Sequence, residues 1–159
     1  MKLNLAAATL ALLALCQCSP AKPTAKLPPQ PLFDVNVDIT AEGIQTLQAA
    51  DDHAVVDVYY YGFPKPGESV EIDQIGRVRL GNDLFPIKAT DKKIRVQPTD
   101  VDPTLLTKVI EPYAQITIYS RTKEHGADEK LECNSYHGSL VNAAKTGVTV
   151  TCDVNRGPD

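Results

Sequence analysis

Apolar and polar residues alternate along several short segments of this chain, and each such segment predicts a β-strand with one buried face. Three other segments place apolar residues at helical spacing behind a capping residue, which predicts brief helices at 40–50, 102–110 and 139–145. The expected strands are 33–39, 54–61, 70–80, 84–89, 92–96, 114–121, 131–136 and 148–154. Short strands with brief helical connections predict a mainly β protein, a two-sheet antiparallel β-sandwich of the transthyretin or immunoglobulin kind.

Glycine and proline mark the expected breaks between these elements. We expect a loop at 62–67 and a turn at 81–83, because both are rich in residues that favour turns. Pro86 should place its strand at a sheet edge or at a bulge, because proline cannot donate a ladder hydrogen bond. Asp102 is an expected N-cap, and Pro112 should stop the helix that follows it.

The first 32 residues have a different pattern. Lys2 precedes an apolar run at 5–15, which is too short to span a bilayer and typical of an export signal, so residues 1–18 are expected to be a signal peptide. Cys16 follows a sequence that resembles a lipoprotein box and is the expected lipidation site, although Leu15 is bulkier than the usual residue there. The alternative is ordinary cleavage after Ala21, which would remove Cys16.

Residues 19–32 hold five of the chain's twelve prolines. Such a segment favours an extended polyproline-like conformation and is expected to be a tether between a membrane anchor and the folded part. Diacylglyceryl modification of Cys16 would give the two acyl chains that stable anchoring requires. Residues 33–159 are long enough for one domain with one core.

The folded part is acidic. Three lysines lie before residue 33, so the net charge of −4 for the whole chain leaves −7 for residues 33–159. An acidic domain gains nothing from phosphate neutralisation, and we expect no nucleic-acid partner. Cys133 and Cys152 are the cysteines of this part, and in an oxidising compartment such a pair is expected to form a disulfide.

Three consecutive tyrosines carry the functional hint. On a strand, Tyr59 and Tyr61 point away from the face that takes Tyr60, and the following 63–66 segment adds rigid amphipathic surface. Tyrosine and phenylalanine are enriched at protein interfaces, so the expected binding surface is Tyr59, Tyr61, Phe63 and Lys65. The alternative is that Tyr60 packs with Val56 and Val58 while the other tyrosines only cover a sheet edge.

No motif in the sequence predicts an enzyme. The pair His137 and Ser139 lacks a nucleophile-elbow sequence, and Ser139 is a natural N-cap. Asp51 with Asp52, and Asp100 with Asp102, lack the spacing of a calcium loop. We therefore expect no catalytic residue, no metal and no cofactor.

Four stretches resemble a family of small exported bacterial β-sandwich proteins and lipoproteins. They are 60–64, 75–81, 116–121 and the 131–133 segment with its partner Cys152. The resemblance supports export and the disulfide and implies no catalytic residues. The expected architecture is also similar to that of the transthyretin-like outer-membrane lipoprotein of the type VI secretion apparatus, as an analogy of fold.

Together these patterns predict an exported envelope protein, periplasmic and anchored at the outer membrane, that binds a protein partner or an envelope component without catalysis. The alternative is a carbohydrate-active or other hydrolytic enzyme on a β-sandwich.

Overall fold

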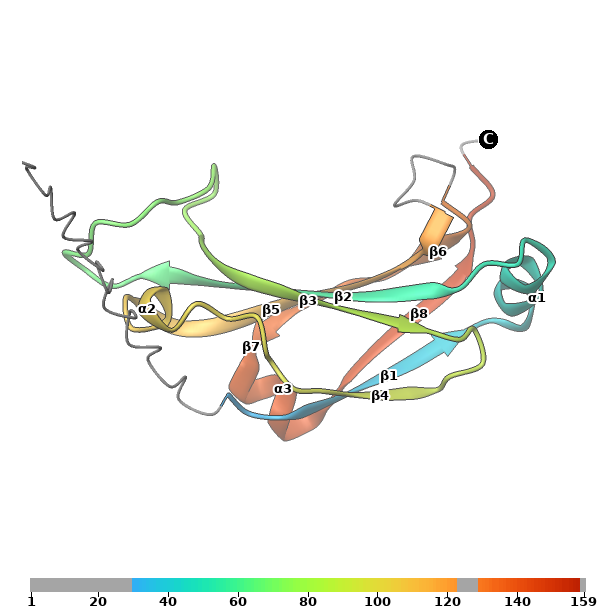
Figure 1. The fold of residues 1–159 in the computed structure, drawn as a ribbon, viewed down its shortest axis with the longest axis horizontal. Coiled ribbons are helices and arrows are strands. Elements are labelled where there is room, and N and C mark those ends of the chain that lie inside the picture. The colour runs from blue at the N-terminus through green and yellow to red at the C-terminus, as the bar shows by residue number, and fades with distance from the viewer. Residues whose placement is uncertain (1–29, 123–128, 158–159) are drawn as a thin grey trace, which may run out of the picture.

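Two four-stranded sheets packed face to face make up the computed structural model, which describes residues 30–122 and 129–157. Sheet A has the strand order β4-β1-β8-β6 and sheet B the order β3-β2-β5-β7 (Figure 1). The elements are β1 Phe33–Ile39, α1 Ala41–Ala49, β2 Ala54–Pro64, β3 Val78–Ile87, β4 Lys93–Val96, α2 Pro103–Leu106, β5 Val109–Ser120, β6 Leu131–Cys133, β7 Tyr136–Ser139, α3 Leu140–Thr146 and β8 Val148–Val154. The predicted two-sheet β fold with short helices is confirmed. The predicted leader, its cleavage sites and the lipidation site Cys16 lie outside the described residues.

The core lies between the two sheets because alternate residues of each strand point inward. In β1, Val35 and Val37 are buried, whereas Asn36 between them is exposed. In β5, Ile116 is fully buried. Tyr60 is also fully buried, on the same face of β2 as Val56 and Val58. This confirms that Tyr60 packs in the core.

The helix boundaries follow their capping residues. Thr40, Asp102 and Ser139 each accept a hydrogen bond from a backbone N–H in the first turn of the helix that follows, and Gly147 ends α3 at φ 70°. These side chains satisfy N–H groups that have no partner within the helix. No helix among the described residues is long and apolar enough to cross a membrane.

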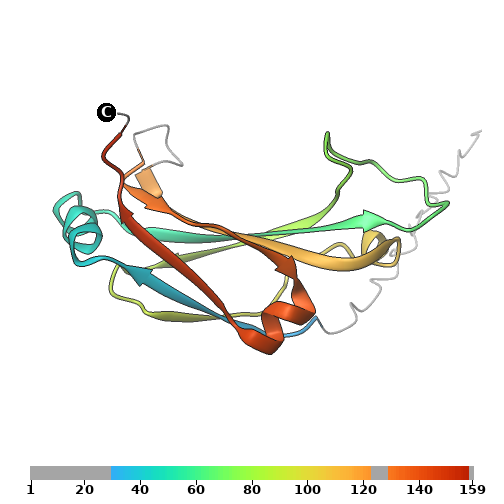
Figure 2. The ribbon, with the colours of Figure 1, turned by 180° about the vertical axis from the view of Figure 1, so that it is seen from behind.

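One strand pair departs from the expected antiparallel pattern. β1 and β8 run parallel, with Val37 opposite Val150, whereas the other strand pairs are antiparallel. A parallel pair needs a long connection, and here the connection is nearly the whole domain, because β1 is its first strand and β8 its last. Figure 2 shows the two strands side by side.

The expected loop at 62–67 begins later in the structure, after Pro64. β2 continues through Gly62 and Pro64, and Gly62 pairs with Val78 on one side and Pro112 on the other. A Cβ on Gly62 would lie 2.7 Å from the Cβ of Val109. The glycine therefore serves a close approach of two strands rather than a turn. Likewise α2 ends at Leu106, and Pro112 lies inside β5 instead of ending a helix.

The expected strand at 70–80 and the turn at 81–83 were also wrong. Residues 70–77 form an irregular loop, and β3 runs without interruption through Gly81. Gly81 has φ +150° and faces the carbonyl of Asp100 so closely that a side chain would not fit. The ladder shifts register opposite this point, between Tyr60 and Tyr61. The glycine thus marks a β-bulge. Pro86 does lie on an edge strand, as predicted.

The expected strand at 131–136 is two strands in different sheets. β6 pairs with β8 in sheet A, whereas β7 pairs with β5 in sheet B, so the chain changes sheets after Cys133. Cys133 lies directly opposite Cys152, with a Cα–Cα distance of 4.1 Å and a formed disulfide. The predicted pairing is confirmed, and it ties the short strand β6 to β8 at the point where the chain leaves the sheet.

Candidate binding surface

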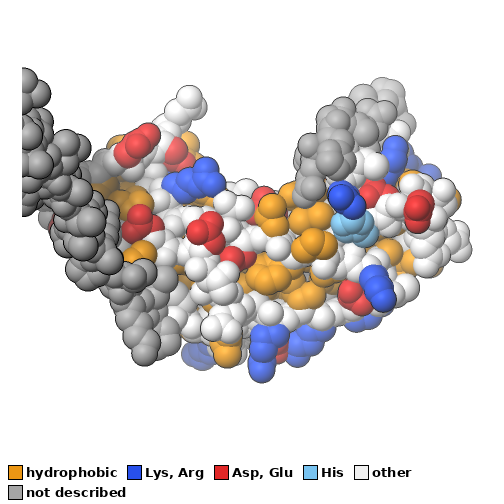
Figure 3. Space-filling view, in the orientation of Figure 1, with side chains coloured by type: hydrophobic (Ala, Val, Ile, Leu, Met, Phe, Trp, Pro, Cys, Tyr) orange, Lys and Arg blue, Asp and Glu red, His pale blue; other side chains and the backbone are white. Residues whose placement is uncertain are grey.

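The outer face of sheet B is hollowed between two raised ends of the molecule. The loop 65–77 rises at one end, and β6 with the end of β8 rises at the other (Figures 1 and 3). Strand register sets the rows of side chains across this face. Tyr59 is flanked by Asn82 and Gln115, and Tyr61 pairs with Tyr113. The hollow therefore carries tyrosine and planar polar side chains from neighbouring strands.

Four aromatic rings form one cluster on this face. Tyr59, Tyr61 and Phe63 follow one another on β2 with the period of two that brings side chains to the same side, and Tyr113 comes from β5. The Tyr61 ring stacks on Tyr113 at 5.5 Å and on Tyr59 at 6.1 Å, measured between ring centroids. Phe63 meets Tyr61 and Tyr113 edge to face. We call Tyr59, Tyr61, Phe63 and Tyr113 the aromatic cluster.

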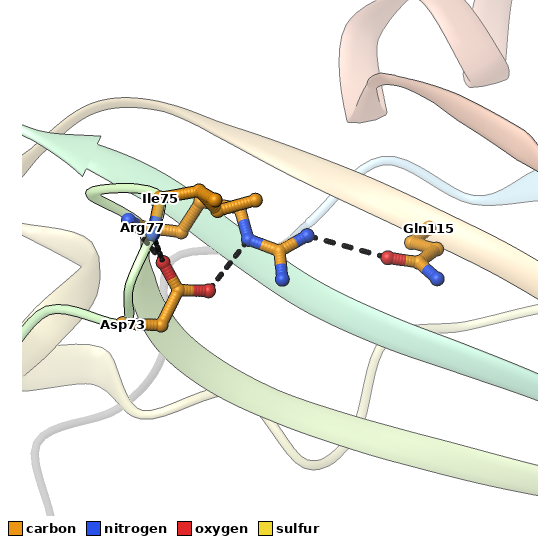
Figure 4. Close-up of polar contacts among 4 residues, drawn as sticks. All are labelled: Asp73, Ile75, Arg77 and Gln115. Atoms are coloured by element: carbon orange, nitrogen blue, oxygen red, sulfur yellow. Dashed lines mark hydrogen bonds and ion pairs between the residues drawn. The ribbon is translucent and has the colours of Figure 1, made fainter.

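Arg77 covers part of the aromatic cluster. Its guanidinium carbon lies 4.9 Å from the Tyr61 ring centroid and 5.5 Å from that of Tyr59. Arg77 Nη1 also donates to Gln115 Oε1 at 3.3 Å, which ties the loop to the sheet (Figure 4). A cation over aromatic faces is attracted by the ring quadrupole. Arg79 adds a second guanidinium, 5.8 Å from the Tyr59 ring centroid.

A tight turn at residues 73–77 places Arg77. Asp73 Oδ1 accepts from the backbone N–H groups of Ile75 and Arg77, and Asp73 Oδ2 accepts from Arg77 Nε at 2.7 Å (Figure 4). Gly76 adopts φ +82°, which suits glycine. The hydrogen bond from the Arg77 backbone, followed by that from its guanidinium, holds the pKa of Asp73 below its ordinary value. Asp73 therefore stays ionised and keeps Arg77 in position at neutral pH.

Exposure differs among the predicted binding residues. Phe63 is 40% exposed, whereas Tyr61 is only 7% exposed because the other rings and Arg77 surround it. The side chain of Lys65 does not join them, because its Nζ donates to the carbonyl of Thr107 at 2.6 Å. The structure thus brings three of the four predicted residues together and uses Lys65 to fix the start of the loop.

Sequence reasoning missed Tyr113 and Gln115. Both had a usable signal, because alternation about the buried Ile116 places them on the outer face of β5. That Arg77 covers the rings had no such signal, since its loop was expected to be a strand. Tyr113 donates to Glu111 Oε1 at 2.6 Å, and this hydrogen bond raises the pKa of Tyr113. The same hydrogen bond helps to fix the ring, which meets Phe63 edge to face.

A groove of about 590 Å³ adjoins the aromatic cluster at the β3 edge. Tyr59, Arg77 and Arg79 line the side of the groove next to the aromatic cluster. Ile72 of the loop and Leu105 of α2 also line it. Ile72 is 52% exposed. The groove shares Tyr59 with the aromatic cluster, and Arg77, which covers that cluster, also lines the groove, so the two surfaces are continuous.

The other polar clusters have structural partners. Ser139 Oγ accepts from the N–H of Asn142 and caps α3, while Asp102 caps α2. Asp52 accepts hydrogen bonds from His53 N–H and from Thr122. Among residues 30–122 and 129–157, no three His, Cys, Asp or Glu side chains come together as a metal site.

Comparison with protein-family models, with curated proteins and with solved structures finds no significant match to this chain.

Proposed function

We propose that this protein is an exported, non-catalytic binding protein of the bacterial envelope, which binds a protein partner through the aromatic cluster. The observation that carries the proposal is the way the rings pack. Tyrosine and phenylalanine supply large, rigid contact area at low entropic cost, and such residues carry most of the energy at protein interfaces. A mixed cluster of aromatic edges, hydroxyl groups and guanidinium groups on a hollowed face is the kind of surface that a protein partner covers.

The packing also favours a protein over a sugar as the ligand. A sugar ring stacks on a free aromatic face, but here the faces of Tyr59 lie against Tyr61, Arg77 and Arg79, and those of Tyr61 against Tyr59 and Tyr113. Edges and hydroxyl groups remain for contact, and these suit the hydrogen-bonding and apolar groups of a protein surface. We therefore place the hydrolase alternative second.

The envelope location rests on two features. The apolar run before Cys16 is typical of an export signal, and the disulfide Cys133–Cys152 is the kind of bond that persists in an oxidising compartment. Lipidation at Cys16 would anchor the domain at the outer membrane.

The test is in vivo crosslinking of the chain in its own cells, followed by affinity measurement with the crosslinked partner. Tyr59→Ala and Phe63→Ala should each weaken that affinity at least tenfold, the loss typical of residues central to an interface. The matched control is Leu84→Ala, because Leu84 is 50% exposed on the same sheet face but outside the aromatic cluster. Equal affinity of all three variants and the parent would refute the proposal.

A further inference from the structure

We propose that the chain's own proline-rich segment, residues 19–29, docks in the groove between the loop 65–77, β3 and α2. The inference rests on the proposed function and deepens it, because the groove shares Tyr59 with the aromatic cluster and is lined by Arg77, which covers that cluster. The segment would then compete with the partner for part of the same surface.

The walls of the groove suit a polyproline helix. Ile72, Leu105 and the edge of Tyr59 give apolar contact, and Ile72 is 52% exposed. A polyproline helix has no internal hydrogen bonds, so it loses few backbone interactions when it lies in a groove, and it loses little entropy because it is already extended. Proline-rich segments dock in aromatic and apolar grooves for these reasons, and here Tyr59 is the single aromatic side chain among the described residues that line the groove.

The charges are complementary. Among the groove residues, Arg77 pairs with Asp73 and Arg79 donates to Asn82, so both cations already have partners. Glu71 also lines the groove and makes no ion pair with any residue that the structure describes. Residues 19–29 contain two charged side chains, Lys22 and Lys26, and no acid. An acidic domain and a basic segment attract each other before contact.

The segment is long enough to reach the groove. Phe33, at the start of β1, pairs with Val96. Asp102 lines the groove and follows Val96 by six residues, so it lies within about 20 Å of Val96 even if the chain between them is fully extended. Residues 19–29 span about 34 Å as a polyproline helix. The start of β1 and α2 also lie in the same half of the molecule (Figures 1 and 2). Docking therefore requires no change in β1.

The experiment compares amide chemical shifts of the processed protein with those of a variant in which residues 19–29 are replaced by glycine and serine at equal length. We expect differences at Tyr59, Ile72 and Leu105 and none at Val141, which is exposed on α3. A synthetic peptide of residues 19–29, added to the variant, should restore the shifts. Ile72→Lys should weaken that binding at least tenfold, and Glu71→Lys, at an exposed site, gives a second variant that disturbs packing less.

Replacing both lysines of the peptide by glutamine should weaken binding about threefold to tenfold at low salt, and the difference should vanish at high salt. Identical spectra of parent and variant would overturn the inference. So would peptide-induced shifts confined to residues outside the groove, or shifts that depend on protein concentration and thus report contact between molecules.

The partner measurement separates this inference from the proposed function. The glycine–serine variant should bind the crosslinked partner several-fold more tightly than the parent, because the segment no longer competes. Equal, tight binding by both would overturn docking and leave the proposed function standing. Loss of the Tyr59→Ala effect in both backgrounds would instead refute the proposed function.

Discussion

Replacing Tyr60 by phenylalanine tests the polar contact inside the core. Tyr60 is fully buried, and its hydroxyl donates to Asp83 Oδ2 at 2.9 Å. Asp83 is 9% exposed and also accepts from the backbone and hydroxyl groups of Thr99. A hydrogen bond to a charged group contributes about 1.5–3 kcal/mol. Tyr60→Phe keeps the ring and removes this bond, so the free energy of unfolding should fall by about 2 kcal/mol. With a urea slope of about 1–3 kcal/mol per M, this lowers the urea midpoint by about 0.7–2 M.

The pH dependence gives a second signature. Burial, and then the hydrogen bond to Asp83, raises the pKa of Tyr60 well above the ordinary value of 10.0, which applies to a tyrosine in an unfolded chain. The stabilisation is therefore complete below pH 10 and falls as the pH rises further, because the unfolded state loses its proton first. The difference between parent and Tyr60→Phe should shrink by about 1.4 kcal/mol at pH 11. Tyrosines common to both proteins cancel in this difference.

Urea titrations followed by circular dichroism at pH 7 and pH 11 measure both effects. Tyr59→Phe is the matched control, because its ring lies on the opposite face of β2 in the aromatic cluster. We expect that control to change stability by less than about 0.5 kcal/mol. Equal effects of the two substitutions, or a difference that stays constant up to pH 11, would refute the role assigned to the Tyr60–Asp83 contact.

Three further predictions follow from the fold and the leader. Reducing Cys133–Cys152, whose sequence separation is 19, should lower the free energy of unfolding by about 3 kcal/mol, and urea midpoints unchanged by reductant would contradict this. Gly62→Ala should cost about 1–3 kcal/mol because its Cβ would lie 2.7 Å from that of Val109; an unchanged melting temperature would show that the strands can separate freely. Cys16→Ser should release the protein from membranes in cell fractionation, whereas unchanged fractionation with an N-terminus at residue 22 would exclude lipidation at Cys16.

Most strands could be predicted from the sequence, because the alternation of buried and exposed side chains along a strand depends only on neighbouring residues. The segments 33–39 and 148–154 were predicted with the bounds that the structure shows, and Asp102 and Ser139 cap helices as expected. The disulfide was predictable because Cys133 and Cys152 were the two cysteines of the domain. Local chemistry and composition determined these features.

The sequence-based predictions were wrong at Gly62 and Gly81 for one physical reason. Glycine and proline are read as turns, but Gly62 and Gly81 here admit Val109 and the Asp100 carbonyl from distant parts of the chain. Whether a glycine turns the chain or makes room for a neighbour depends on that neighbour, which only the tertiary structure supplies.

The candidate surface divides in the same way. The sequence by itself determined that Tyr59 and Tyr61 share one side of a strand and that Tyr60 lies on the other, whereas only the structure extended the strand to Phe63. Only the tertiary structure decided that Tyr113 stacks beside Tyr61, that Arg77 reaches over both strands from the loop, and that Lys65 turns away. Strand parity follows from the backbone of one segment, whereas a surface built by three segments depends on sheet register, and register is set by packing across the whole domain.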